Sequence, residues 1–102
     1  MSQDMKDSMM GVIENVIDPE LGIDIVNLGL IRDVELSEEG TAIVTMTLTS
    51  MGCPMGPQIV ANIEQELMEL PEVKEVEVKI VWSPPWSKEY MSRYAKIALG
   101  VR

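Results

Sequence analysis

The sequence has 102 residues, of which 46% are hydrophobic and 25% are charged, as is typical of one globular domain. It contains no histidine, which excludes a Ser-His-Asp triad, a Cys-His dyad and an imidazole metal ligand. The net charge of −9 argues against nucleic-acid binding, which needs a basic surface to neutralise phosphates.

The charges are unevenly distributed along the chain. Residues 1–87 carry 16 acidic and 4 basic side chains, a net charge of −12, whereas residues 88–102 carry a net charge of +3. The basic C-terminal segment could dock an acidic partner, or it could pair with the acidic body of its own chain. Charged runs usually lie on solvated surfaces, which favours the second interpretation.

Cysteine usage and hydropathy indicate the compartment. Cys53 is the only cysteine, so no intrachain disulfide can form. No signal peptide is recognisable, and no apolar run approaches the roughly 18 residues that a membrane-spanning helix needs. We therefore expect a cytoplasmic protein without membrane association.

The first predicted element is a helix over residues 4–17. Asp18-Pro19 is expected to end it, because the residue before a proline is pushed out of the helical region. A loop at 18–27 then follows. The apolar stripe at helical spacing consists of Met5, Met9, Val12, Ile13, Val16 and Ile17.

Residues 28–37 and 41–49 predict a β-hairpin with a turn at 37–40. Both segments alternate apolar and polar side chains, which indicates one buried face. The threonines of the second segment are expected on the solvated face; they are Thr41, Thr45, Thr47 and Thr49.

A second amphipathic helix is predicted over residues 57–70. Pro57 suits the first helical position with Gly56 as its cap, and Pro54 is an alternative start. Residues 72–82 again alternate, which predicts a third, half-buried strand.

The C-terminal segment contains a proline turn and a predicted short helix. Residues 83–86 cannot continue a strand ladder, because neither proline offers an N–H group. Residues 87–99 predict a helix that begins at a Ser87 cap and stops at Gly100.

The order of elements predicts one α+β domain over residues 1–102. Two helices would cover one face of a three-stranded sheet in a two-layer α-β-β-α-β arrangement, followed by the short C-terminal helix. The hairpin is antiparallel and the second helix returns the chain, so the third strand should run parallel to the second. Whether the third strand lies beside the first or the second stays open.

This topology brings three irregular loops to one end of the sheet. They are residues 18–27, 50–56 and 83–86, which are rich in glycine and proline. Loops that are grouped on a rigid scaffold are where function usually lies.

Cys53 lies in the second of these loops, within one turn of a helix start. Unpaired amide groups there stabilise a thiolate and lower a cysteine pKa from about 8.5 to between roughly 3.5 and 7.5. The alternative is a small buried side chain, the commonest role of a free cysteine. Its position outside both helical stripes favours a functional role.

Acidic and aromatic side chains accompany the cysteine. Asp18, Glu20 and Asp24 could bind a metal or serve as helix-end and turn residues, and the structural role is favoured for Asp18 and Glu20. Trp86 follows two prolines and is either a lid over the thiol or a plug on the core.

Four motifs occur along the chain: DPE at 18–20, NLGL at 27–30, LTSMGCP at 48–54 and WSPPW at 82–86. Together they resemble the iron–sulfur assembly domain of SufT-like and PaaD-like proteins, which are related to eukaryotic cytosolic iron–sulfur targeting factors. The resemblance covers nearly the whole chain and implies a non-enzymatic auxiliary factor for iron–sulfur protein maturation.

By this resemblance the functional cysteine is Cys53 and the acidic loop contains Asp18 and Glu20. The motifs also imply a set of supporting residues, namely Asn27, Thr49, Ser50, Gly52, Pro54, Pro84, Pro85 and Trp86. Met51 departs from the small residue or proline that is common at its position.

A single thiolate cannot hold a whole cluster, which generally takes four cysteine ligands. The resemblance therefore implies transient iron or iron–sulfur cluster contact, with no tightly bound cofactor. Two protomers, or a protomer and a client, could share a labile cluster. The implied partners are assembly proteins and client apo-proteins.

Two alternatives to this function stay open. One is an adaptor with a structural Cys53 that binds its partners through the basic C-terminal helix and the Trp86 loop. The other, a thiol redox enzyme, is disfavoured because no second cysteine and no histidine are present.

Overall fold

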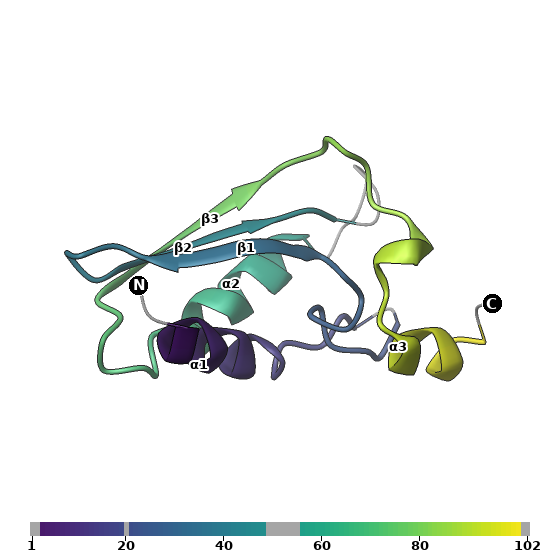
Figure 1. Cartoon of the computed structure of the whole chain (residues 1–102), viewed down its shortest axis with the longest axis horizontal. Helices are drawn as coiled ribbons and strands as arrows, with labels where there is room; N and C mark the ends of the chain where they lie inside the picture. The colour runs from purple at the N-terminus through teal and green to yellow at the C-terminus, as the bar shows by residue number, and fades with distance from the viewer. Residues whose placement is uncertain (1–2, 20, 49–55, 101–102) are drawn as a thin grey trace.

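The computed structural model describes residues 3–19, 21–48 and 56–100 (Figure 1). Several predicted site residues therefore lie outside the described residues: Glu20, Thr49, Ser50, Gly52, Cys53 and Pro54. The seven elements are α1 (Gln3–Ile13), β1 (Ile31–Leu36), β2 (Thr41–Met46), α2 (Gly56–Leu67), β3 (Glu75–Ile80), the 3-10 helix η1 (Lys88–Tyr90) and α3 (Arg93–Ala98).

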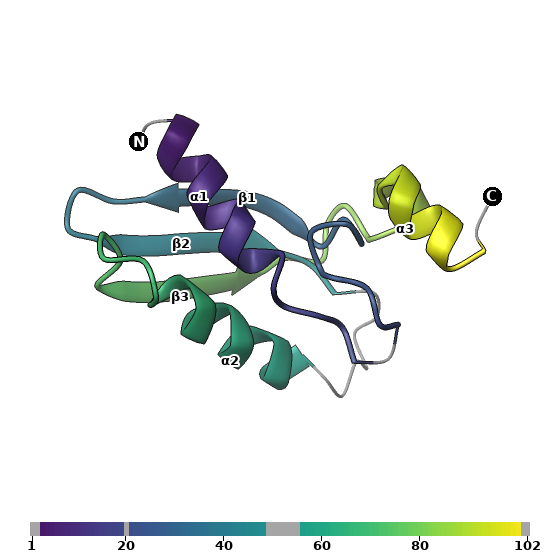
Figure 2. The same ribbon diagram turned by 90° about the horizontal axis from the view of Figure 1, so that it is seen from below.

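The predicted two-layer α+β fold is confirmed. β1 pairs antiparallel with β2, and β2 pairs parallel with β3, so β3 lies beside the second strand in the order β1-β2-β3. α1 and α2 lie side by side on one face of the sheet, with α2 toward the β3 edge (Figures 1 and 2). η1 and α3 lie beyond the end of the sheet that is opposite the β1–β2 turn (Figure 2).

Alternation along β2 forms the centre of the core. Ala42, Val44 and Met46 are completely buried, as the sequence pattern predicts. β3 is one of the two edge strands, and its inward side chains are less protected than those of β2. Val76 and Val78 are half-buried, whereas Ile80 is 38% exposed and Trp82 is also exposed, so the predicted burial does not extend to the end of this strand.

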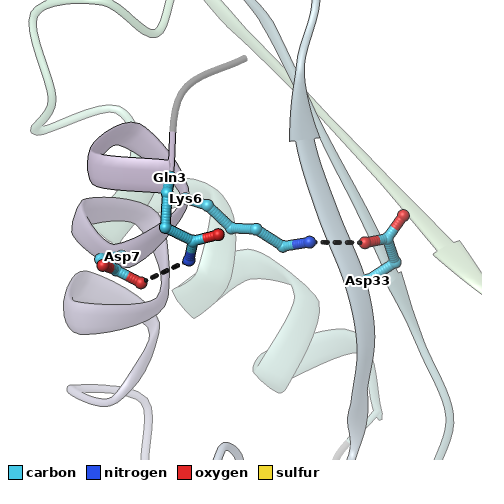
Figure 3. A network of polar contacts seen from close by, with 4 residues as sticks. All are labelled: Gln3, Lys6, Asp7 and Asp33. Atoms are coloured by element: carbon cyan, nitrogen blue, oxygen red, sulfur yellow. Dashed lines mark hydrogen bonds and ion pairs between the residues drawn. The ribbon is translucent and has the colours of Figure 1, made fainter.

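The helices contribute the other side of the core. Met9 and Ile13 of α1 are completely buried, as are Ile59, Ile63 and Leu67 of α2. α1 is also linked to β1 by an exposed ion pair between Lys6 and Asp33 (3.5 Å), and Gln3 donates to Asp7 within the helix (2.9 Å; Figure 3). Exposed pairs of this kind stabilise little, so the apolar stripe holds the helix in place.

The first helix is shorter than predicted. α1 ends at Ile13 rather than at Ile17, because the chain turns to pair with the following loop. The Ile25 amide donates to the Val16 carbonyl and the Asp18 amide to the Ile23 carbonyl, both at 3.0 Å. Val16 remains in the core, but Ile17 is 46% exposed.

Thr47 corrects the prediction of a solvated threonine face. Its side chain is completely buried, although Thr41 and Thr45 are partly exposed as expected. β2 ends at Met46, and beyond it the Thr47 amide donates to the Leu30 carbonyl (2.8 Å). The alternation therefore stops with the strand.

The predicted C-terminal helix is divided into two short helices. Ser87 caps η1 as expected, but Met91 is extended and buried and Ser92 caps α3. The break allows the Ser92 amide to donate to the Asn27 carbonyl (2.8 Å), a contact with a loop far away in sequence.

Candidate functional site

The third predicted loop contacts the segment that directly follows the first loop. The Trp86 indole N–H donates to the Leu28 carbonyl (2.8 Å), and the Arg32 guanidinium donates to the Pro84 carbonyl (2.6 Å). The structure thus brings the third loop to Leu28 and β1, next to the end of the first loop. The second loop, which carries Cys53, lies almost entirely outside the described residues.

The NLGL motif is where the C-terminal segment docks. The Asn27 side-chain oxygen accepts from the Ser92 hydroxyl (2.6 Å), and that hydroxyl also accepts from the Ala95 amide to cap α3 (3.2 Å). Gly29 has φ +77°, and its α-carbon faces the Tyr90 backbone so closely that a Cβ would collide with it. Asn27 and Gly29 therefore bind a neighbouring segment of the chain.

Asp24 orients Asn27 through two hydrogen bonds within the same turn. One carboxylate oxygen accepts from the Asn27 amide (2.9 Å) and the other from its side-chain Nδ2 (2.6 Å). Asp24 is therefore a turn residue, as one of the two sequence interpretations proposed.

Asp18 is buried at the start of the acidic loop, with 3% exposure. Its carboxylate accepts from the Leu21 amide (3.3 Å), and its carbonyl accepts from Gly22 (2.8 Å). These are the contacts of a turn residue, the role that the sequence favoured. Contact between Asp18 and a metal or Cys53 stays a prediction.

Trp86 has the contacts of a plug. Its ring packs against the core cluster, and its indole N–H donates to the Leu28 carbonyl. Pro84 contributes its carbonyl to Arg32, and Pro85 is exposed. The alternative role of Trp86 as a lid over the thiol depends on the position of Cys53, which lies outside the described residues, so it stays a prediction.

Sequence reasoning missed Arg32 and Tyr90. The Arg32 guanidinium carbon lies 4.9 Å from the centre of the Tyr90 ring, a cation–π distance that adds to its bond with Pro84. A signal was present in the sequence, because a basic residue occupies an inward position between Leu30 and Val34. A bulge between Ile31 and Asp33 lets the strand accommodate it.

The Cys53 segment is bounded by two buried residues. Leu48 precedes it and Gly56 begins α2, and a Cβ on Gly56 would lie only 3.0 Å from a Leu48 methyl carbon. The predicted second helix is present, but it begins at Gly56, one residue before the predicted start, and ends at Leu67 rather than at Leu70. Within the described ranges, no group of three or more His, Cys, Asp or Glu side chains could hold a metal ion. The same part of the chain contains no helix that is both long and apolar enough to cross a membrane.

The fold and the site define a small α+β domain with irregular loops at one end of a three-stranded sheet. The model of the iron-sulfur cluster assembly protein family matches residues 6–80. The chain belongs to this family, which confirms the membership that the four motifs predicted.

Relatives of similar length extend the match beyond the family model. The chain is 58% identical over 102 residues to the Fe-S protein maturation auxiliary factor YitW of Bacillus subtilis (strain 168), with both chains fully covered. It is 67% identical over 86 residues to the auxiliary factor SufT of Staphylococcus aureus (strain USA300), covering 84% of this chain and 98% of that protein. The crystal structure of a domain of unknown function from Bacillus anthracis superposes with a TM-score of 0.91 at 55% identity, covering 98% and 95% of the two chains.

Proposed function

We propose that this protein is an auxiliary factor for iron–sulfur protein maturation that contacts its cargo through Cys53. The observation that carries the proposal is the full-length likeness to a relative named as such a factor. The chain would act as one domain over residues 1–102, in the cytoplasm, and without catalysing a reaction.

The chemistry of the proposal rests on one thiol before a helix. Cys53 lies three residues upstream of the first residue of α2, where free backbone amides favour a thiolate. Because a cluster generally takes four cysteine ligands, this thiolate would share iron or a cluster with an assembly protein, a client apo-protein or a second protomer. Asp18 and Glu20 would orient or ligate the cargo, with no cofactor held permanently.

The supporting residues have two kinds of role in this proposal. Asn27 holds the first loop to the start of α3, and Pro84 and Trp86 hold the third loop to β1 and to Leu28. Thr49, Ser50, Gly52, Pro54 and Pro85 would shape the turn and the loop edge around the thiol.

The test replaces Cys53 by serine in cells and measures the activities of client iron–sulfur enzymes under high iron–sulfur demand. We expect these activities to fall while the amount of folded factor stays the same. Anaerobic reconstitution with iron and sulfide, followed by absorbance and native mass, should show less iron in the Cys53→Ser protein. Unchanged client activities and unchanged iron would refute the role of the thiol.

A second candidate function is an adaptor with a structural Cys53. It is favoured by the basic side chains Lys88, Arg93 and Lys96, which form no ion pair with any other described residue. No ion pair therefore ties these side chains to the acidic body among those residues, and electrostatic attraction over a longer distance stays a prediction. Reversing these three charges should abolish partner capture under the adaptor hypothesis and leave it intact under the thiol hypothesis.

A further inference from the structure

An apolar groove of about 400 Å³ lies between α2 and the end of β3. Among the described residues of its wall, Glu64 is the only charged one. The described lining residues are Leu48, Gly56, Pro57, Val60, Ala61, Glu64 and Ile80. The groove is thus formed by the outward face of α2 and by the exposed end of the edge strand.

The groove adjoins the segment that carries Cys53. Leu48 and Gly56 are the residues directly before and after positions 49–55, and both are in the wall. A ligand in the groove would therefore bind next to both ends of the cysteine segment.

β3 offers a free strand edge beside the groove. It pairs with β2 on one side, and no other described strand lies on its outer side (Figure 2). An extended segment can add to such an edge through main-chain hydrogen bonds, with alternate side chains directed to opposite faces.

The charges at this edge indicate which side chains a bound segment should carry. Val76, Val78 and Ile80 lie on the face toward the helices, so Glu75, Glu77 and Lys79 lie on the opposite face, where two acidic side chains outweigh one basic side chain. The α2–β3 unit, residues 56–80, carries 6 acidic and 2 basic side chains, a net charge of −4. Opposite charges on neighbouring strands attract, so the partner should present basic side chains on the face of Glu75 and Glu77.

We propose that the groove and the β3 edge bind an extended client segment in which aliphatic and basic residues alternate. An aliphatic side chain would enter the groove between Val60 and Ile80, and lysine or arginine side chains would lie beside Glu75 and Glu77. The assignment to a client rests on the proposed function, because binding here would bring client cysteines near Cys53.

The test measures binding of fluorescent peptides to the full chain by fluorescence polarisation. The probe is KVKLKVK, and the controls are KSKSKSK, with the same charge, and EVELEVE, with the same apolar side chains. We expect KSKSKSK to bind at least about tenfold more weakly, because burying a large aliphatic side chain changes affinity by roughly 10- to 100-fold. EVELEVE should not bind measurably. Equal affinity for KVKLKVK and KSKSKSK would overturn the proposal.

A matched pair of variants locates the binding. Ala61→Arg places a long side chain in the groove at an exposed helix position and should weaken KVKLKVK binding about tenfold or more. Ile97→Arg makes the same charge change on α3, at a residue that is 70% exposed, and should leave binding unchanged. Equal affinities of the two variants for KVKLKVK would overturn the proposal. A dimer that light scattering detects and that Ala61→Arg dissociates would also overturn it, because a second copy of the chain would then occupy the groove.

The Cys53→Ser protein separates this inference from the proposed function. It should bind KVKLKVK as the unaltered protein does, because serine is close to cysteine in size and the proposed contacts are with Val60, Glu75, Glu77 and Ile80. If Ala61→Arg leaves KVKLKVK binding unchanged while Cys53→Ser lowers client activities, the docking site alone is overturned. If Ala61→Arg weakens the binding while Cys53→Ser leaves client activities unchanged, only the role of the thiol is overturned.

Discussion

At the residue scale, Gly29 is the tightest point between the first loop and the C-terminal segment. We expect Gly29→Ala to lower the free energy of unfolding by about 2–5 kcal/mol, because it combines backbone strain at positive φ with overpacking against the Tyr90 backbone. A backbone atom cannot move aside as a side chain does. Urea denaturation of the two proteins measures the difference.

Gly22 provides the matched control for this substitution. It has φ +72°, but a Cβ there would meet no atom within 4 Å. Gly22→Ala should therefore lower the free energy of unfolding by only about 1 kcal/mol, the penalty of the left-handed conformation. Equal losses for the two glycines would contradict the close approach at Gly29.

At the element scale, α3 depends on its contact with the first loop. A helix of six residues is unstable alone, so its N-cap and its docking must hold it. We expect Ser92→Ala to lower the free energy of unfolding by about 1–2 kcal/mol, because the hydroxyl caps the helix and also donates to Asn27. Amide hydrogen exchange in α3 should accelerate in the same variant.

The Asn27–Ser92 pair can be tested with a double-mutant cycle. Because the two side chains share one hydrogen bond, the double alanine variant should lose less stability than the sum of the single variants, by about 0.5 kcal/mol or more. Additive losses would mean that the two residues act independently. Ser87→Ala, which removes the cap of η1, is the control because its contact is local.

At the scale of the whole molecule, no ion pair joins the acidic body to Lys88, Arg93 or Lys96 among the described residues. We expect neutralisation of Lys88, Arg93 and Lys96 to glutamine to change the free energy of unfolding by less than about 0.5 kcal/mol for each residue. Urea denaturation at low and high salt is the measurement. Lys6→Gln, which removes the exposed pair with Asp33, is a control expected to lose about 0.2–1 kcal/mol.

A larger loss of unfolding free energy in the glutamine variants, if it disappears in high salt, would have a different meaning. It would show that the C-terminal segment is attracted to the body over a distance, since salt screens exposed charges. The basic residues would then stabilise the chain rather than remain available to a partner.

The sequence by itself determined the types and order of the elements and the parallel direction of β3. The reason is that the spacing of apolar residues along the chain differs between a strand and a helix. Buried residues such as Val44 in β2 and Ile63 in α2 follow these two spacings. It also placed Cys53 directly before a helix, because the helical pattern begins next to it.

Only the tertiary structure decided where α1 ends, why the C-terminal helix divides, and what Asn27, Arg32 and Trp86 contact. Each of these outcomes depends on a hydrogen bond to a distant or returning segment: Val16 with Ile25, Ser92 with Asn27, and Trp86 with Leu28. A local pattern contains no record of such partners, because their proximity exists only after the sheet has brought the two loops to the same end.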